Sequence, residues 1–475
     1  MRTRLLIAGI AITGVVPVVT ATAQQSVRGA GAIRDSATSH ASLRSAPVLD
    51  AFIAHALAVS PALHAAMARV DAARARVGPA SALPDPMLML GIINQPLGTM
   101  PVASTTTGTM PTGAGPEPMT MRMIGVSQRM PYPGKLSLQR RSAEYGVEAS
   151  HASLDAARRQ LIRDVKIAFY EIAFIDQART IVERNGDVLT GLIAVSESRY
   201  SVGAVGQQDV LKARVEATRL AETAALLAEQ RVAMAAQLNA LLDQPSETPV
   251  PPLMMPEAIA RAAVPASSDA IHFTSNVLGS RAADSPLRSL AELQDAAIRE
   301  SPEIREHQAA LAAQSTRVEL ARRDYLPDID LSLQYGQRAG GLPDMISATV
   351  SVPIPIFKGR KQDQQVAEAT AELAALEGDH HRMVNTIRGD VARLVSEIER
   401  ERTQLALVVK AILPQGRAAL VSATANYQVG KAEFLAVLEN QSTVFNYETE
   451  YFRVVTDFAT KVAELERVVG GEVLK

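Results

Sequence analysis

The sequence predicts a mainly α-helical protein with a small β part, written as two similar halves. Three observations lead to this fold class. Alanine, glutamate, arginine, glutamine and leucine dominate the composition, which favours long helices. A long run without proline follows the segment Pro131-Tyr-Pro-Gly134, and a similar border, Pro353–Gly359, returns in the second half. Four short segments loosely or strictly alternate apolar and polar residues, as strands do.

The N-terminus reads as a secretory signal. A basic start precedes an apolar core, Leu5–Val19, and the A-x-A cleavage pattern Ala21–Ala23. A membrane anchor is the alternative, but the apolar run is short and is interrupted by glycine and proline. We therefore expect an exported chain, with residues 1–23 removed and a polar, mobile segment over residues 24–46.

The composition excludes several classes of protein. The chain contains no cysteine, which rules out disulfides, thiolate metal sites and a lipid-modified cysteine. Its net charge of -2 gives no indication of nucleic-acid binding. After the signal we find no run of about 18 apolar residues, so we expect no transmembrane helix. If the protein lies in a membrane, it must do so through β-strands.

Four landmarks recur in the same order and divide the chain into two repeats. Each repeat has a helix opened by Ser-Pro and ended by Leu-Pro-Asp, two strands, a proline-rich border, and two long helices joined at Tyr-x-Val-Gly. The repeats are predicted at 47–243 and 286–470, with a connector at 244–285 and a tail at 471–475.

Each element has its own signal. The strands are placed by alternation and the helices by apolar stripes with spacings of three, four and seven residues. A short helix is expected at Glu257–Ala263 in the connector. The strands are predicted near 86–94, 121–130, 328–336 and 345–353, and the long helices at 135–200, 206–243, 358–426 and 432–470.

An ordinary helical bundle or a fibrous coiled coil would show the same helical stripes. The strands argue against both. In Ile329–Gly336, apolar and polar residues alternate strictly, which fits a lipid-facing side and a watery side. A soluble sheet would alternate in the same way. Four strands cannot close a barrel around a lumen, and open strand edges are not tolerated in lipid, so a membrane sheet must close by oligomerisation.

The duplicated order and the two turns Tyr200–Gly203 and Tyr427–Gly430 resemble the TolC family of outer-membrane efflux channels, over roughly Pro47 to Val469. The segment Val126–Leu136 is similar to the heavy-metal branch of that family, the Cus and Czc-type outer components. The resemblance implies a homotrimeric β-barrel in outer-membrane lipid that continues as an α-helical tunnel across the periplasm. It also implies a passive conduit that works with a periplasmic adaptor and an inner-membrane pump, for heavy-metal cations.

The family comparison also implies roles for the helix turns. Glu439 falls on an acidic gate position, whereas Ala436 occupies the other, so a double acidic ring is not expected. Lys431 and Glu433 are further gate candidates, and Asp209 is expected to cap the following helix rather than conduct. A solvated helix surface is the alternative for Glu439. The turn residues expected to contact the adaptor are Val202, Gly203, Gly206, Val429 and Gly430.

The proline-rich borders would join barrel and tunnel, because proline ends a strand and glycine allows a sharp change of direction. The junction residues are Pro131, Pro133, Gly134, Pro353, Pro355 and Gly359.

Methionines gather before the first border, and Met119, Met121 and Met123 alternate so that a strand would place them on one face. Their thioethers suit copper(I) or silver(I). The alternative is that methionine fills irregular apolar space. The intervening loop Gln95–Thr120 would lie outside the cell.

No catalytic constellation or cofactor motif is recognised, so we expect neither an enzyme nor a cofactor. Three functional interpretations remain: a metal efflux channel, a multidrug or small-molecule channel of the same family, and, less favoured, a periplasmic adaptor or structural coiled coil. An adaptor would have one helical hairpin, flanked by β-rich segments and an anchor, whereas this chain repeats the hairpin.

Overall fold

The computed structural model describes residues 49–93, 121–264, 286–338 and 342–474. The predicted signal peptide, the segment 24–46, the loop Gln95–Thr120 and Met119 lie outside the described residues. The chain divides into two units, Met1–Pro47 and Val48–Lys475, and every described residue belongs to the second.

Helices form most of this unit, with one four-stranded sheet. The helices are α2 (Leu49–Val59), α3 (Pro61–Ser81), α4 (Lys135–Ser201), α5 (Gln207–Leu241), α6 (Glu257–Ala263), α7 (Leu290–Glu300), α8 (Pro302–Arg323), α9 (Gln362–Leu407), α10 (Leu413–Gln428) and α11 (Phe434–Val469). The strands are β1 (Met87–Ile93), β2 (Met121–Met130), β3 (Ile329–Arg338) and β4 (Met345–Ser351), and two short turns of helix are η2 (Lys358–Arg360) and η3 (Val408–Ile412).

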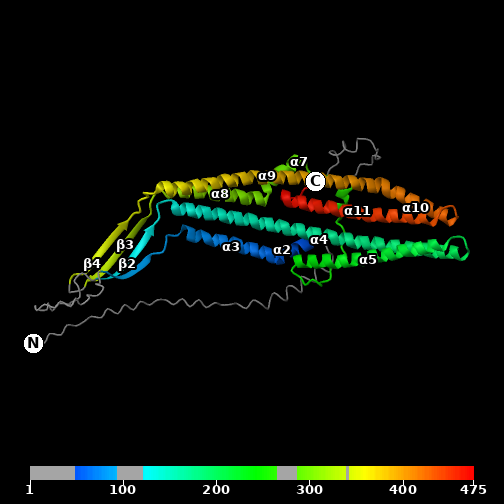
Figure 1. Ribbon diagram of the computed structural model, residues 1–475, viewed down its shortest axis with the longest axis horizontal. Helices are drawn as coiled ribbons and strands as arrows, with labels where there is room; N and C mark the ends of the chain where they lie inside the picture. The colour runs from blue at the N-terminus through cyan, green and yellow to red at the C-terminus, as the bar shows by residue number, and fades with distance from the viewer. Residues whose placement is uncertain (1–48, 94–120, 265–285, 339–341, 475) are drawn as a thin grey trace, which may run out of the picture. The chain divides into compact units, whose positions relative to one another are not determined.

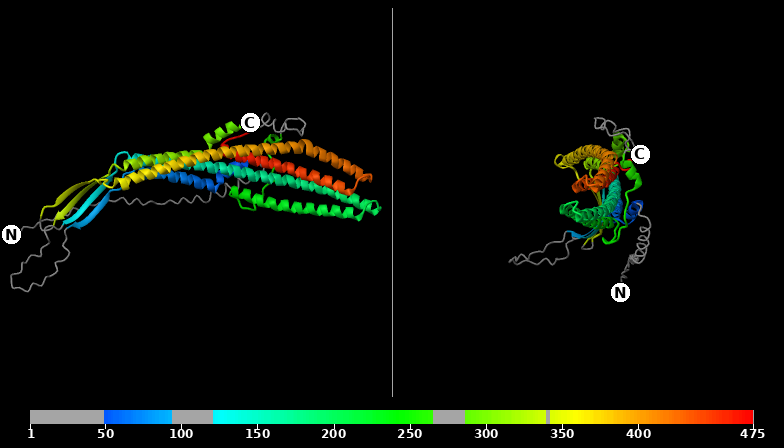
Figure 2. Two further views of the ribbon diagram at one scale, coloured as in Figure 1. Left: turned by 45° about the horizontal axis from the view of Figure 1, so that its top comes forward. Right: turned by 90° about the vertical axis from the view of Figure 1, so that its right-hand side faces the viewer.

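The long helices lie side by side, with the strands beyond one end of them (Figure 1). The turns that join α4 to α5 and α10 to α11 lie at the opposite end, and the left view of Figure 2 shows the same arrangement. Helix α4 is central, because it packs against α3, α5, α8 and α11.

Apolar stripes on the long helices make the core. On α4, Leu161, Val165 and Ile172 recur at spacings of four and seven and are buried. On α11, Phe458 and Val462 lie in one cluster with Val391 of α9. Many stripe positions are alanine, whose small side chain lets neighbouring helices approach closely.

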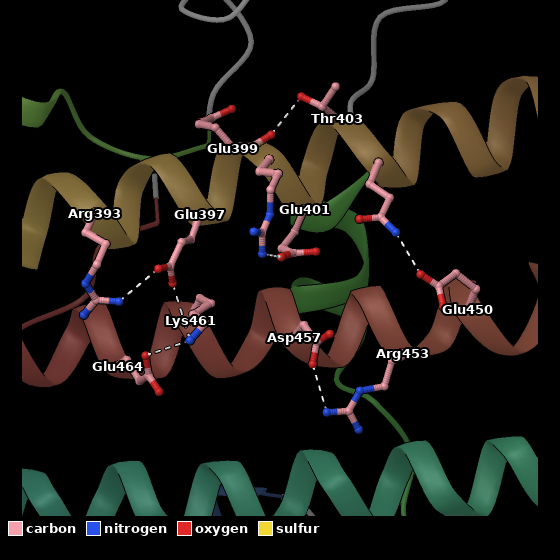
Figure 3. Close-up of polar contacts among 12 residues, drawn as sticks. Arg393, Glu397, Glu399, Glu401, Thr403, Glu450, Arg453, Asp457, Lys461 and Glu464 are labelled. Carbon is pink, nitrogen blue, oxygen red and sulfur yellow. Dashed lines mark hydrogen bonds and ion pairs between the residues drawn. The ribbon is translucent and has the colours of Figure 1, made fainter.

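A polar ladder joins α9 to α11 beside this core (Figure 3). The Lys461 ammonium lies 3.4 Å from Glu397 of α9 and 3.3 Å from Glu464 of its own helix. Gln404 donates to the Glu450 carboxylate at 2.8 Å. Burial alone would raise the pKa of Glu397, but its hydrogen bond from Arg393 and the charge of Lys461 hold that pKa below its ordinary value. The ladder therefore keeps both helices in register while Glu397 stays ionised.

The strands form one antiparallel sheet in the order β1-β2-β3-β4. Its register is continuous, so residues paired across strands share a face throughout. The central pair, β2 and β3, joins the two halves of the chain, with Met121 opposite Arg338 and Met130 opposite Ile329.

The second half differs from the single helix expected at 358–426. Residues Lys358–Arg360 form a 3₁₀ turn, and α9 begins only at Gln362. Further along, the π-helix η3 separates α9 from α10, which carries Pro414 in its first turn. Proline has no N–H for the regular helical bond, which accounts for a wider turn just before it.

Among the described residues, the helical segment Lys358–Gln428, which comprises η2, α9, η3 and α10 in succession, is long and apolar enough to cross a membrane, and the bent pair α2 and α3 passes the same test together. This finding does not contradict the expectation of no transmembrane helix, because that expectation rests on the lack of an unbroken apolar run, whereas a window with up to two charged residues passes here. Core helices of soluble proteins pass the same test, so the membrane assignment depends on the sheet.

Candidate functional site

The sheet has one strongly apolar face. Leu90 of β1, Ile124 of β2, Tyr335 of β3 and Ile346 of β4 lie on it in register, and all four side chains are exposed. Ile346 is 75% exposed. The opposite face carries polar residues of β3 and β4. The alternation in the sequence thus corresponds to two chemically different faces of one sheet.

The sheet also has two unpaired edges, β1 and β4, among the described residues. β1 pairs only with β2, and β4 pairs only with β3, among the described residues. A strand without a second neighbour leaves backbone N–H and C=O groups that must find partners elsewhere, and in lipid only another strand can supply them.

The first border, between β2 and α4, is tied down by several contacts. Gly134 has φ 92°, a left-handed conformation that favours glycine, and it precedes the first residue of α4. A side chain at Gly134 would overlap the Arg323 guanidinium, which donates to the Pro133 carbonyl at 2.8 Å. The predicted role of Pro131–Gly134 as a sharp turn at the strand's end fits this geometry.

Lys135 anchors the same border. Its side chain is buried, and its ammonium lies 2.9 Å from Asp328 and 3.1 Å from Asp324. Burial alone would lower the pKa of Lys135, but the two carboxylates raise it above its ordinary value. Likewise, burial would raise the pKa of Asp328, but hydrogen bonds from Lys135 and from the Tyr132 N–H hold that pKa below its ordinary value. The pair thus stays charged across neutral pH.

The second border does not repeat this arrangement. Gly359 lies inside the 3₁₀ turn η2 and is absent from the glycines with positive φ. The prediction that Gly359 supplies the same change of direction as Gly134 is therefore wrong, because the chain turns through helical backbone that any residue can adopt. Pro353 and Pro355 flank Ile354, which is exposed, as are Ile356 and Phe357.

The two helix turns share one backbone geometry. Gly203 and Gly430 have φ values of 74° and 77°. In each turn the glycine N–H donates to the tyrosine carbonyl, at 2.9 and 3.0 Å, and the next N–H reaches back to the residue before that tyrosine. This is the Schellman motif, which satisfies the last carbonyls of a helix. It explains why Tyr-x-Val-Gly ends a helix twice.

The side chains of the two turns differ. Tyr200 is 47% exposed, whereas Tyr427 is 2% exposed. Arg199 lies 4.6 Å above the Tyr427 ring and donates to its backbone carbonyl, and the Phe434 ring lies 5.5 Å away. Leu192 and Ala213 of the first half complete this cluster. The second turn is thus packed against the end of α4, while the first stays open.

The predicted adaptor-contacting residues lie on these turns. Val202 is 76% exposed and Val429 is 67% exposed, so each turn presents a valine to its surroundings. Gly206 has φ -77° and immediately precedes α5, as Glu433, with the same φ, precedes α11.

Of the four gate candidates, Glu439 alone lines the described groove between α5 and α11. Glu439 lies on the wall of a groove of about 680 Å³ between α5 and α11, together with Lys212 and Arg219. Its carboxylate forms no salt bridge with any described residue. Lys431 and Glu433 are located in the turn before α11.

Asp209 does not cap α5. The capping position is Gly206, where no side chain accepts a hydrogen bond, and Asp209 lies in the first helical turn. The prediction of a cap is wrong because the helix begins earlier than its acidic residue. A carboxylate in the first turn still interacts favourably with the helix dipole.

Sequence reasoning missed several residues that organise these sites. Lys135 and Asp328 are separated by 193 positions, and Arg199 and Tyr427 by 228. No local pattern reports such pairs, although the repeated Leu-Pro-Asp that includes Asp328 marked the position as unusual. Lys212 stands as far after Tyr200 as Glu439 stands after Tyr427, which the repeat could have revealed.

Comparison with known proteins agrees with this geometry. The family model described as outer membrane efflux protein matches residues 52–244 and 293–471. The cobalt-zinc-cadmium resistance protein CzcC of Cupriavidus metallidurans is 22% identical over 71% of this chain and 74% of its own length. Nodulation protein T of Rhizobium leguminosarum bv. trifolii is 25% identical over 89% of this chain and 85% of its own.

Among solved structures, the outer-membrane channel OprN superposes with a TM-score of 0.71 at 18% identity, covering 90% of each chain. That likeness concerns the fold: a mainly helical chain with a small antiparallel sheet. Because the two segments matched by the family model cover most of the chain, the resemblance to TolC-like proteins is confirmed. The chain belongs to the outer membrane efflux protein family, whose members are outer-membrane channels and not enzymes.

Proposed function

We propose that this chain is the outer-membrane component of a tripartite efflux system. Three copies would bring their four-stranded sheets together into one barrel of about twelve strands in the outer membrane. The helices of the three copies would form a tunnel that extends into the periplasm. The two halves, 47–243 and 286–470, would serve as structural repeats that each give two strands and two long helices.

The observation that carries this proposal is the sheet. Its apolar face is exposed over all four strands, and its outer strands each lack a second neighbour among the described residues. In water such a face would favour aggregation, and in lipid the open edges would cost several kcal/mol for each unsatisfied group. A barrel closed with other copies in the outer membrane would pair the open edges and place the apolar face against lipid.

The channel itself would be passive. Energy would come from an inner-membrane pump, reached through a periplasmic adaptor that contacts the turns carrying Val202, Gly203, Gly206, Val429 and Gly430. Exposed apolar side chains at both turns support this assignment, because an exposed valine on a tight turn gives a partner an apolar contact.

The closed end of the tunnel would be lined by Glu439, one copy from each chain, with Lys431, Glu433 and Asp209 nearby. A ring of carboxylates favours cations. Lys212 shares the groove wall with Glu439, so the local field combines both charges.

Heavy-metal cations are the substrates that we propose. The relative CzcC is named for cobalt, zinc and cadmium resistance, and that name supports the proposal at 22% identity. The alternative is a small-molecule or drug channel of the same family. The match to Nodulation protein T covers more of this chain, and the name of that protein specifies no metal.

Deletion of the gene in its host tests the substrate. Growth would be compared on copper, silver, zinc, cadmium, nickel and cobalt, and on a panel of hydrophobic drugs, with the wild-type gene restored as the control. We expect selective sensitivity to metals. Sensitivity to drugs alone would reject the metal proposal in favour of the alternative, and unchanged growth on every compound would reject both.

A further inference from the structure

The apolar face of the sheet continues past the end of β4. Val350 lies on that face within the strand. Beyond it, Val352, Ile354 and Ile356 keep the spacing of two residues, with a proline at each position between them. A residue before proline is held in extended backbone, which preserves the alternation of a strand without its hydrogen bonds. Ile354 and Ile356 are 78% and 77% exposed, so an uncovered apolar stripe leaves the sheet here.

An aromatic ring and three cations follow this stripe directly. Phe357 is 75% exposed, and η2 begins at the next residue. Lys358, Arg360 and Lys361 are exposed, and none of the three forms a salt bridge with a described residue. Asp363, the nearest acidic residue along the chain, already accepts a hydrogen bond from a tyrosine hydroxyl. Apolar side chains, an aromatic ring and unpaired cations therefore succeed one another within residues 352–361.

The first border, in contrast, holds its cations inside the protein. Lys135 is buried, with its ammonium beside Asp324 and Asp328. Arg129 lies 2.9 Å from Asp330. These charges tie the strands to the helices. The cations of the second border have no such task among the described residues, so their charge is available to a ligand.

The order of side chains across the second border matches the boundary between lipid and water. Apolar residues suit hydrocarbon, aromatic rings gather at the level of the headgroups, and lysine and arginine reach outward from the membrane with their charged ends. The sheet lies beyond one end of the helices, and β4 leads into α9 at this border (Figure 1). With the sheet in the outer membrane and the helices in the periplasm, residues 352–361 would cross the periplasmic surface of the membrane.

A neighbouring copy of the chain is the other candidate to cover this border. Asp324, Asp328 and Asp330 at the first border are already paired. Asp85, just before β1, is exposed and could meet a cation of a neighbouring chain if β1 and β4 pair between copies. That one carboxylate would leave two of the three cations without a partner. A membrane surface that carries phosphates supplies negative charge for all three, so the charges favour lipid.

We propose that residues 352–361 form a binding site for anionic phospholipid. The three cations donate to the phosphate oxygens, for which the fork of N–H groups on Arg360 is well suited. Ile354, Ile356 and Phe357 contact the acyl chains beside them. A bound lipid fixes the start of α9 at the membrane surface. The site rests on the membrane placement of the sheet in the proposed function, but not on the transported substrate or on the pump.

Native mass spectrometry of the full chain, purified in detergent, tests the site. Phosphatidylglycerol is titrated beside phosphatidylcholine with the same acyl chains, because only the former headgroup has a net negative charge. The wild-type protein should bind phosphatidylglycerol at least about tenfold more tightly, since each basic residue contributes about fivefold at an anionic surface. Lys358→Gln/Arg360→Gln/Lys361→Gln should lose this preference and keep the weaker binding of phosphatidylcholine.

Two further variants separate the site from net charge. Arg158→Gln/Arg299→Gln/Arg388→Gln removes the same charge from exposed positions on α4, α7 and α9 and is the matched control. It should keep the wild-type preference. A variant that exchanges lysine for arginine and arginine for lysine at the three positions of the second border keeps the charge there and should also bind as the wild type does.

The apolar part of the site has its own test. Ile354→Ser/Ile356→Ser/Phe357→Ser keeps the cations and should weaken the binding of both lipids alike, because it removes the contacts with the acyl chains. Inorganic phosphate, added at the concentration of the lipid, should not displace phosphatidylglycerol from the wild-type protein. Displacement would show a site for free anions and overturn the assignment to lipid.

Two other results would overturn the site. The first is equal binding of the two lipids by the wild-type protein. The second is a preference for phosphatidylglycerol that survives in the triple glutamine variant of the second border. If that variant also fell apart into single chains while the wild type did not, the cations would belong to a contact between copies.

Lipid binding is measured apart from transport, so the two proposals can fail separately. A host that is insensitive to metals and drugs, with a chain that still prefers phosphatidylglycerol through these cations, would contradict the efflux function alone. A sensitive host whose channel binds both lipids equally would contradict this site alone.

Discussion

The turn after α4 and the turn after α10 have the same backbone and different neighbours. Both end a helix with a left-handed glycine and the same two hydrogen bonds. Yet Tyr200 is open to its surroundings, whereas Tyr427 lies under Arg199 and against Phe434. The repeat thus preserves the local turn and varies its contacts, which lets one turn hold the helix ends together while the other stays free.

The two borders also differ in their contacts. At the first border, position 134 has a left-handed backbone that favours glycine, and Lys135 is paired with two carboxylates. The second border turns through a 3₁₀ helix and has neither feature. Equivalent positions in the two halves should therefore respond unequally to the same substitution.

Tyr427→Ala should have the largest effect. Truncating a fully buried aromatic side chain costs about 3–5 kcal/mol, and here it would loosen the ends of α10 and α11. Hydrogen exchange should show faster opening over residues 420–440. Tyr200→Ala is the matched control, and as an exposed substitution it should change stability by less than about 0.5 kcal/mol. Equal exchange rates in the two variants would contradict the claim that packing stabilises the second turn and not the first.

Gly134→Ala should be the next largest. A left-handed conformation costs a residue with a Cβ about 1–2 kcal/mol, and Arg323 would also have to leave the Pro133 carbonyl. The counterpart Gly359→Ala should cost no more than about 0.5 kcal/mol, since its backbone is helical. Thermal unfolding in detergent measures both, and a loss at Gly359 as large as at Gly134 would contradict the difference between the borders.

Acid should weaken the first border selectively. Because the folded pKa of Asp328 lies below its ordinary value of 3.8, its contribution is complete above that value and is lost as pH falls through the folded pKa. The raised pKa of Lys135 keeps its contribution complete up to its ordinary 10.5. Asp328→Asn should therefore lower stability at pH 7 and reduce the further loss toward pH 3.

Thermal midpoints between pH 3 and 7 check this, with Asp71→Asn as the control, because Asp71 forms only an exposed pair with Arg74. A control variant that loses as much stability at pH 7 as Asp328→Asn would show that the border pair contributes nothing particular.

Substitutions in the groove between α5 and α11 should have the smallest effect on stability. Their effects on the cation preference of the channel should be opposite in the two halves of the chain. Glu439→Gln should reduce the preference of the channel for cations, and Lys212→Gln should increase it, because the two residues have opposite charge at equivalent positions. Reversal potentials in planar bilayers under a salt gradient measure the preference. Shifts of the same sign in both variants would exclude a shared pathway past these residues.

Much of the fold is predictable because its signals are local. Alternation marks strands such as Ile329–Arg338, and Tyr-x-Val-Gly marks a Schellman turn wherever it ends a long helix. The π-helix Val408–Ile412 is less visible, since its cause, Pro414, also suits the first turn of an ordinary helix. The predicted cap at Asp209 is wrong because α5 begins after Gly206, a residue without a side chain that could cap the helix.

The candidate sites were predictable in part. The spacing of Met121 and Met123 predicts that they share one face of a strand. That Met345 lies on the same face of the sheet follows only from the strand order and register. The contacts of Lys135 with Asp328 and of Arg199 with Tyr427 join the two halves, and neither partner carries a local signal of the other. Sequence patterns report what a residue does to its own segment, and the partner across the fold comes from packing.

The number of chains in the assembled particle tests the central claim most directly. The protein would be extracted from outer membranes in mild detergent and weighed by native mass spectrometry, with and without heating. A mass of three chains that collapses to one on boiling is the result expected if three open sheets close one barrel. A stable single chain, with its apolar sheet face covered only by detergent, would contradict the channel.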